Sequence, residues 1–447
     1  MIGARTVLDR CTELARITAD APRIERVYLS AEHAAANTLV AEWMERAGLR
    51  TWQDAAGNLC GRREGRIDGL PALMIGSHLD TVPDAGAYDG PLGVLMAIAV
   101  AERLRDHHLP FALEVIAFND EEGSRFGTAL LGSQAVAGRW QDHWWDQKGR
   151  DGLTLRRAFT DFGLDPGRVS EAARTPAELV GYLEAHIEQG PYLEAEDRSL
   201  GLVSAIAGAR RFRLSILGEA GHAGGTPYPR RRDALVSACE AITMIERVAR
   251  ESGENGCIAT VGQIQVQPGA VNVIPGQADF TLDLRAATDV QRDAMWDGIR
   301  VEIERMCSSR GTRLEVFETH SAPACECASW LRDAIATGIR RTGDDDPRSL
   351  WSKAGHDAMA MGAICDVAML FIRCREGVSH HPAEDVREID VVRGIDAYEQ
   401  TVLEIARLYD VRDGAGAAAG RTDVRSGAVP ALAGPADLRV RTGREGQ

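Results

Sequence analysis

Short apolar runs that end in polar, chemically active residues recur along the 447-residue chain and limit the folds that it can adopt. Residues 71–76 (PALMIG) lead into Ser77-His78, and residues 111–118 (FALEVIAF) lead into NDEEGS. A third run, 367–373 (VAMLFIR), precedes the loop EGVSHHPAED. Runs of this length are typical of strands that are buried on both faces. The helical pattern GVLMAIAVAERLRD lies between the first two runs, so the sequence predicts an α/β fold with a mixed, mostly parallel sheet flanked by helices.

The pattern of predicted elements changes over residues 210–325, and 447 residues exceed one ordinary core. Strand and helix signals there follow the order β-α-β-β-α-β, which is that of a split βαβ, ferredoxin-like α+β module. Because strand–helix alternation resumes afterwards, we interpret this module as an insertion between two parts of one domain, residues 1–209 and 326–412. Residues 413–447 are rich in Gly, Ala, Pro and Arg without an amphipathic period, which predicts a disordered tail.

Composition limits the class of protein. Apolar residues make up 45% and charged residues 26% of the chain, as in soluble globular proteins. The net charge of −15 argues against a nucleic-acid partner, whereas cations inside a cleft would still admit an anionic substrate. The sequence shows no signal-peptide h-region and no apolar run of membrane-spanning length, so we expect no membrane association. Nine scattered cysteines indicate a reducing compartment and hence a cytoplasmic protein.

Five imidazole and carboxylate groups form a candidate ligand set for two divalent cations that share one carboxylate. They are His78, Asp89, Glu122, His186 and His380. We expect each to lie at or just beyond the carboxyl end of a strand, where ligands bind in open α/β sheets. Two such cations can lower the pKa of a shared water, so the set predicts a hydrolytic site. Zinc or manganese would suit these ligands, and cobalt and nickel are also compatible.

Each of these positions also has an ordinary structural explanation. An Asp-Gly pair such as Asp89-Gly90 is usually a turn, and adjacent acids such as Glu121-Glu122 are usually a solvated face. The remaining histidines of interest are expected at the surface; they are His33, His107, His108, His143 and His320. The joint pattern is more specific than any single residue.

Nine motifs occur once each and in one order: GSHLDT, AYDG, DEEGSRFG, HIEQG, GEAGHAGGTP, VNVIPG, DLRA, AGHDAM and SHHPAE. Over residues 1 to about 410 they resemble the dinuclear amidohydrolases that include allantoate amidohydrolase and N-carbamoyl-L-amino acid hydrolase, relatives of aminoacylases and dinuclear exopeptidases. The resemblance implies a dinuclear zinc exopeptidase-like catalytic domain. It also implies that the ferredoxin-like module is a lid and dimerisation domain of a homodimer.

The resemblance assigns roles to the candidate ligands. His78 and His186 would bind the first metal, Glu122 and His380 the second, and Asp89 would bridge the two. Asp80 would orient His78 from behind. Glu121 would be the general base that takes a proton from water and returns it to the leaving nitrogen.

Further roles implied by the resemblance concern the substrate. His222 would stabilise the oxyanion when the lid closes, reaching the site from the second subunit. Gln189, Asn272, Arg285 and the backbone at Gly355 would bind the substrate, and His356 would shape the pocket. Arg285 offers a fork of N–H donors that matches a carboxylate. Without the resemblance, His222 would be a turn histidine and Arg285 a surface arginine at a strand end.

Three positions depart from the wording that the resemblance leads one to expect: Gly225 and Tyr228 beside His222, and Lys353 in SKAGHD, where Ser-Gly-Ala-Gly-His-Asp is usual. They leave the exact substrate open. The implied reaction cleaves a carbamoyl or ureido C–N bond of a small carboxylate and releases ammonia and carbon dioxide. The residues VAMLFIRC before GVSHHP favour allantoate as the substrate.

Alternative activities remain open at this point. An N-carbamoyl-L-amino acid hydrolase or a β-ureidopropionase would use the same site. A dipeptidase or aminoacylase is more distant, because those relatives generally have a carboxylate where this chain has His186. A non-catalytic binding protein would be expected to lack a ligand or the base, yet all five ligands and Glu121 are present.

Overall fold

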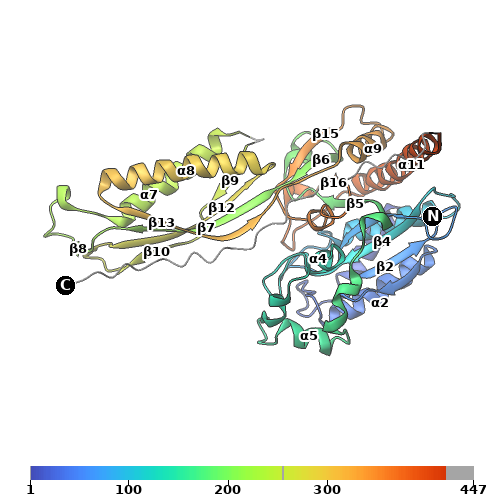
Figure 1. The fold of residues 1–447 in the computed structure, drawn as a ribbon, viewed down its shortest axis with the longest axis horizontal. Helices are drawn as coiled ribbons and strands as arrows, with labels where there is room; N and C mark the ends of the chain where they lie inside the picture. The colour runs from blue at the N-terminus through green and yellow to red at the C-terminus, as the bar shows by residue number, and fades with distance from the viewer. Residues whose placement is uncertain (1, 254–255, 419–447) are drawn as a thin grey trace.

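Two β-sheets carry the fold and follow one another along the long axis of the molecule (Figure 1). The computed structural model describes residues 2–253 and 256–418, with backbone only for residues 412–418. The first sheet has nine strands and the second has five, and β8 (Gly221–His222) pairs with β11 (Val273–Ile274) in a separate ladder. Each large sheet has a hydrophobic core of its own.

The first sheet has the strand order β1-β2-β4-β3-β5-β16-β6-β14, with β15 paired to β6. Its strands are β1 (Arg50–Gln53), β2 (Leu59–Arg63), β3 (Ala72–His78), β4 (Ala112–Phe118), β5 (Leu179–Ile187), β6 (Leu200–Ile206), β14 (Cys325–Glu326), β15 (Arg348–Ser352) and β16 (Val367–Ile372). The central strands β4, β3, β5 and β16 are parallel, and antiparallel pairs lie on both sides of them. The predicted α/β class with a mixed, mostly parallel sheet is confirmed.

The strands that the apolar runs predict lie at the centre of this sheet. Every residue of β3, β4 and β16 is buried, because helices and loops cover both faces. The β1–β2 hairpin and the strand β6 are present in the sheet but were not predicted from the sequence.

Helices α1, α3 and α11 pack around the centre of the first sheet. α3 contacts β3, β4 and β5 and is buried from Pro91 to Ala101, and α1 and α11 pack against it. Pro91 occupies the first turn of α3, as its fixed φ angle favours. The helices of this region are α1 (Ala4–Leu14), α2 (Ala31–Arg46), α3 (Pro91–Arg103), α4 (Leu131–Val136), α5 (Leu155–Asp161), α6 (Tyr192–Ala195), α9 (Ser329–Arg340), α10 (Ala358–Met361) and α11 (Glu388–Ala418).

Two expectations from the sequence need correction here. The terminal helix α11 continues to Ala418, six residues past the boundary at 412, so the tail predicted for 413–447 does not begin at 413; its residues 419–447 lie outside the described residues. His33 is buried rather than at the surface, with 3% of its area exposed. Its ring stacks on Phe162, and its Nδ1 accepts the N–H of Leu29.

The second sheet has the order β10-β12-β7-β13, with β9 paired to β12, and all its pairs are antiparallel. Its elements are β7 (Gly208–Leu217), α7 (Ala234–Glu251), β9 (Ile258–Thr260), β10 (Ile264–Gln267), β12 (Gln277–Ala286), α8 (Asp289–Arg310) and β13 (Arg313–Ala322). α7 and α8 cover one face (Figure 1), and the ring of Trp296 on α8 stacks on that of Phe212 on β7 with 3.8 Å between the centroids. This strand order is that of a split βαβ module.

Two of the strands predicted for this module are divided. The segment CIATVGQIQVQ forms β9 and β10, which are separated at residues 261–263. The segment VIPGQADFTLDLRA begins as β11 and continues as β12 after Pro275-Gly276. No helix within the described residues is long and apolar enough to cross a membrane.

Candidate metal centre

The five predicted ligands meet at one edge of the first sheet. His78 is the last residue of β3, His186 lies one residue before the end of β5, and Glu122 follows β4 in its exit loop. The expectation that every ligand lies at or just beyond the carboxyl end of a strand is wrong for the other two. Asp89 lies in the loop just before α3, and His380 lies well beyond β16. Long loops bring both back to the edge where the parallel strands end.

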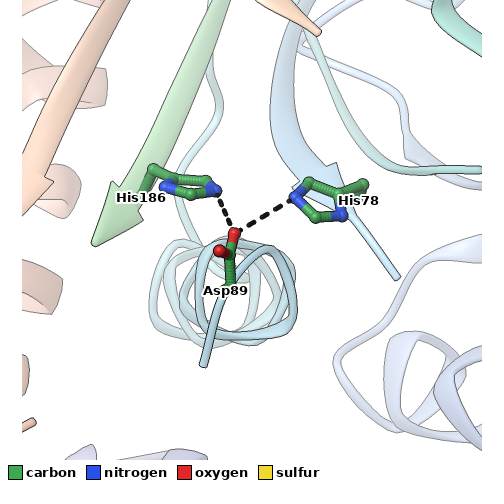
Figure 2. Close-up of side chains that lie close together, drawn as sticks. All are labelled: His78, Asp89 and His186. Atoms are coloured by element: carbon green, nitrogen blue, oxygen red, sulfur yellow. Dashed lines mark ion pairs between the residues drawn. The ribbon is translucent and has the colours of Figure 1, made fainter. Parts of the chain in front are cut away.

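Asp89 is the centre of the cluster. Its Oδ1 lies 3.1 Å from His186 Nε2 and 3.6 Å from His78 Nε2. Its Oδ2 lies 3.2 Å from His380 Nε2, which is also 3.1 Å from Glu122 Oε1. Figure 2 shows the imidazoles of His78 and His186 converging on the Asp89 carboxylate from opposite sides. One carboxylate thus faces two groups of donors, His78 with His186 and Glu122 with His380.

Backbone hydrogen bonds fix which nitrogen of each imidazole faces Asp89. His186 Nδ1 lies 2.9 Å from the carbonyl oxygen of Ile187, and His78 Nδ1 lies 3.1 Å from that of Asp80. A carbonyl can only accept, so each Nδ1 carries the proton and each neutral ring turns the lone pair of Nε2 toward Asp89. His186 Nε2 is buried and has no hydrogen-bond partner among the described residues.

A lone pair aimed at a carboxylate requires a cation between them. In the metal-free chain a proton can take that place. Burial opposes charge on Asp89, but the neighbouring imidazoles of His186, His380 and His78 hold its pKa well below the ordinary value. The pKa of His380 is raised to about 10 by the hydrogen bonds of its imidazole to Asp89 and Glu122. The donor set, imidazole and carboxylate around one bridging carboxylate, therefore fits two divalent cations.

Asp80 connects the loops that carry the other acids. Its carboxylate accepts the backbone N–H groups of Glu121 and Glu122, both at 3.1 Å. The carboxylate lies 3.6 Å from His78 Nδ1, farther than the carbonyl of the same residue. Asp80 therefore holds the β4 exit loop against the end of β3 in addition to its expected place behind His78.

Glu121 lies beside the ligands and is buried. Burial, together with the negative charges of Glu122 and Asp357, raises its pKa well above the ordinary value, although His78 opposes this. An added Cβ on Gly355 would lie 3.9 Å from Glu121 Oε1, so the loop at Gly355 faces this carboxylate. A carboxyl group with a raised pKa is suited to accept and return a proton near neutral pH.

A family model described as peptidase family M20/M25/M40 matches residues 74–404. The chain belongs to this family. The predicted resemblance to dinuclear amidohydrolases of this group is thereby confirmed.

Proteins similar to this chain carry amidohydrolase, deiminase and amidase names. The N-carbamoyl-L-amino acid amidohydrolase of Geobacillus stearothermophilus is 38% identical over 388 residues, which are 86% of this chain and 94% of that protein. The allantoate deiminase of Arabidopsis thaliana is 38% identical over 412 residues, 86% of this chain and 78% of that protein. The crystal structure of an amidase of the hydantoinase/carbamoylase family from Burkholderia multivorans has a TM-score of 0.82 at 30% identity and covers 91% of this chain and 98% of that chain. This M20 chain is a hydrolase of carbon–nitrogen bonds.

Three of the residues expected to bind the substrate of this M20 chain lie beside the proposed metal ligands. Gln189 Nε2 donates to Asp89 Oδ2 at 2.7 Å. The ring of His356 lies 4.6 Å from that of His186, and its Nε2 is 2.7 Å from the hydroxyl of Ser352. Gly355 lies close to Glu121, as described above.

The other three candidates are held apart from the ligands. Arg285 on β12 binds Asp283 through Nε (2.9 Å) and Nη2 (3.1 Å) and donates from Nη1 to the carbonyl of Lys353 (2.8 Å), so its fork is occupied. His222 and Asn272 lie together, because β8 pairs with β11 and Ala223 N donates to the Asn272 carbonyl. Figure 1 shows β8 at the end of the second sheet that is remote from the first sheet.

Ser379 and Glu384 of the M20 site were not singled out from the sequence. The hydroxyl of Ser379 lies within hydrogen-bond distance of Asp89 Oδ2 and of Glu384 Oε2, and its one proton can be donated to either of them. Glu384 Oε1 accepts the backbone N–H of Tyr88 (2.7 Å) and of Asp89 (3.0 Å). Burial and the charge of Asp89 raise the pKa of Glu384 to about 6. Both residues belong to the SHHPAE motif, which was the available signal.

Proposed function

We propose that this M20 chain is a dinuclear, metal-dependent amidohydrolase that cleaves a carbamoyl or ureido C–N bond of a small carboxylate and releases ammonia and carbon dioxide. The observation that carries the proposal is the convergence of three imidazole Nε2 atoms on the two oxygens of Asp89. Amidohydrolase relatives at 38% identity along 86% of the chain support the bond type.

Two cations, whether zinc, manganese, cobalt or nickel, would be held by His78 and His186 on one side, by Glu122 and His380 on the other, and by Asp89 between them. When bound, they supply Lewis acidity for a substrate carbonyl and for a water nucleophile. Glu121 takes the proton of that water and hands it to the leaving nitrogen. Gln189 and the Gly355 loop border the position where the substrate binds, and burial of Glu121 keeps bulk water away from the proton transfer.

The substrate is proposed in order of support. Allantoate comes first, because the residues before GVSHHP favour it. An N-carbamoyl-L-amino acid is the second candidate, because a cavity of about 200 Å³ beside Gln189 offers room for an amino-acid side chain. A dipeptidase or acylase activity is disfavoured by His186 at the first metal position.

We further propose a homodimer in which the second sheet supplies His222 to the partner's metal centre. His222 is exposed and lies on β8, remote from the ligands of its own chain (Figure 1). Its Nδ1 accepts the N–H groups of Gly224 (3.1 Å) and Gly225 (2.9 Å), which leaves the proton on Nε2. A histidine in this tautomer is an oxyanion donor that needs an acceptor from elsewhere.

The proposal is tested by ammonia release from purified protein loaded with manganese, zinc or cobalt. The panel contains allantoate, ureidoglycolate, N-carbamoyl-β-alanine, several N-carbamoyl-L-amino acids and a set of dipeptides. We expect turnover of at least one carbamoyl or ureido compound and none of the dipeptides. Cleavage of dipeptides alone would contradict the proposed bond type.

A further inference from the structure

We propose that Lys353 and Trp351 form an anion-binding pocket beside the metal centre, which selects carbamoyl substrates whose side chain ends in a second carboxylate. This inference rests on the proposed function and narrows its second substrate candidate, the N-carbamoyl-L-amino acids, to the derivatives of acidic amino acids. Four observations carry it.

The first observation is the cavity itself. It has a volume of about 200 Å³ and is lined by residues that include Gln189, Tyr192, Trp351 and Lys353. Gln189 also donates to Asp89, the carboxylate at the centre of the ligand cluster. The cavity therefore opens beside the reacting centre, and the side chain of a bound substrate can reach it.

The second observation concerns the two positively charged side chains near this pocket, Arg285 and Lys353. Arg285, the residue expected to bind a substrate carboxylate, is held by Asp283 and by the carbonyl of Lys353. Lys353 Nζ instead lies 3.5 Å from the ring centroid of Tyr192 and 5.3 Å from that of Trp351. Within the described residues no carboxylate oxygen lies within 4 Å of this nitrogen, and Glu188 interacts with its charge at longer range. Of these two cations, Lys353 is the one whose charge is available for a carboxylate.

The third observation is an unused hydrogen-bond donor. Trp351 is 5% exposed, and its buried Nε1–H has no acceptor among the described residues. A buried donor without a partner destabilises the fold, because it has lost its hydrogen bond to water. An anion in the cavity that Trp351 and Lys353 line would supply the missing acceptor.

The fourth observation concerns the acid in the same lining. Glu188 is nearby, but its Oε1 accepts the N–H of Tyr192 (2.9 Å) and its Oε2 that of Leu193 (3.0 Å). These bonds fix the start of α6 and occupy both carboxylate oxygens. The remaining walls include Leu350 and Phe371, which suit the methylene groups of a short acidic side chain.

The test compares two substrates that differ in one charge, N-carbamoyl-L-glutamate and N-carbamoyl-L-glutamine, with allantoate as a third. For the wild type we expect kcat/KM for the glutamate derivative to exceed that for the glutamine derivative by about tenfold or more, as a charge-assisted contact provides. Lys353→Met should bring the ratio close to one, mainly by raising KM for the glutamate derivative. Lys353→Arg should restore part of the preference.

A direct readout of occupancy is available because Lys148 and Lys353 are the only lysines in the sequence. Lys148 is exposed and lies far along the chain from the pocket, so it serves as an internal control. N-carbamoyl-L-glutamate should slow the reaction of Lys353 with an amine-selective reagent several-fold and leave Lys148 unchanged. Peptide mass analysis separates the two sites.

The following results would contradict the proposed anion-binding pocket. A wild-type ratio of one or less, or a ratio that Lys353→Met leaves unchanged, would show that Lys353 does not select the charge. Turnover of allantoate without this preference would reject the pocket and keep the proposed function. If no carbamoyl or ureido compound were cleaved, the proposed function would fall, and protection of Lys353 by N-carbamoyl-L-glutamate would still decide the pocket.

Discussion

At the residue scale, the site brings imidazole lone pairs and carboxylate oxygens close together. These electron-rich atoms are compatible at such distances only when cations lie between them. Asp89 receives His78, His186 and His380 within 3.6 Å, and two of these rings are fixed by backbone carbonyls with their lone pairs inward. Such an arrangement costs stability without a cation and binds one strongly when it is present. The neighbouring Glu121 has a different task, because it accepts a proton instead of a metal.

Glu121→Gln separates these two tasks. The amide keeps the size of the side chain but cannot take a proton, so we expect kcat to fall by about 10²–10⁴-fold while the metal content stays at the wild-type level. Steady-state ammonia release and elemental analysis of the same sample measure both. Glu178→Gln, an exposed acid on a 3-10 helix, is the control. Near-normal turnover in Glu121→Gln would remove the assigned role.

His33 predicts a pH effect on stability. Burial lowers its pKa from 6.5 to about 4 in the folded chain, so the unfolded chain takes up a proton below pH 6.5 that the folded chain does not. The contribution of His33 is therefore complete above pH 6.5 and is lost as pH falls toward 4, by about 1.4 kcal/mol per pH unit. In urea unfolding, the stability gap between wild type and His33→Gln should narrow from pH 7.5 to pH 5. A gap that widens would contradict the assignment.

At the scale of elements, the start of α3 must approach the end of β3 closely. Gly90 has φ +82°, and an added Cβ would lie 2.5 Å from the imidazole of His78. We expect Gly90→Ala to displace His78 and weaken metal binding by at least about tenfold, as loss of ligand support typically does. Gly69→Ala is the matched control, because Gly69 has φ +79° and open space around it. Equal metal affinity of both variants in a chelator competition would contradict this account.

The elements that the sequence predicts best are those with one dominant signal. β3, β4 and β16 are mostly apolar and buried throughout, and α3 begins at its proline. The division of one predicted strand into β9 and β10 was missed, because its residues are half-exposed and carry little pattern. Burial of His33 was missed for a similar reason, since it depends on Phe162, which is distant in the sequence.

In the candidate site, too, the residues with a strong local signal were predicted and those that depend on distant contacts were not. Residue types and order were sufficient to collect the five ligands, because each motif is local. The roles of Ser379 and Glu384 were not predictable in the same way, since they depend on a loop that returns nearly 300 residues later to Asp89. The occupied state of Arg285 was also hidden, because its partner carbonyl at Lys353 belongs to a loop outside the second sheet.

At the scale of the whole molecule, the proposed donation of His222 to the partner's metal centre requires two subunits for one complete site. We expect Glu121→Gln and His222→Asn each to inactivate the enzyme, whereas a mixed dimer would contain one site with both residues intact. Coexpression at equal levels should therefore restore about one quarter of the wild-type activity. The control is a mixture of the two variant dimers, purified separately and kept under conditions in which they do not exchange subunits. No recovery in verified mixed dimers would place His222 in its own subunit's site, and a monomeric mass would remove the dimer.

The central claim, that paired cations at Asp89 make this chain a carbamoyl amidohydrolase, is tested most directly by metal titration. Chelator-treated protein is titrated with manganese or zinc while ammonia release from the best substrate is followed. We predict no activity at the start and a rise that levels off at about two equivalents per chain. Full activity of the metal-free protein, or saturation with metal without ammonia release from any carbamoyl or ureido compound, would contradict the claim.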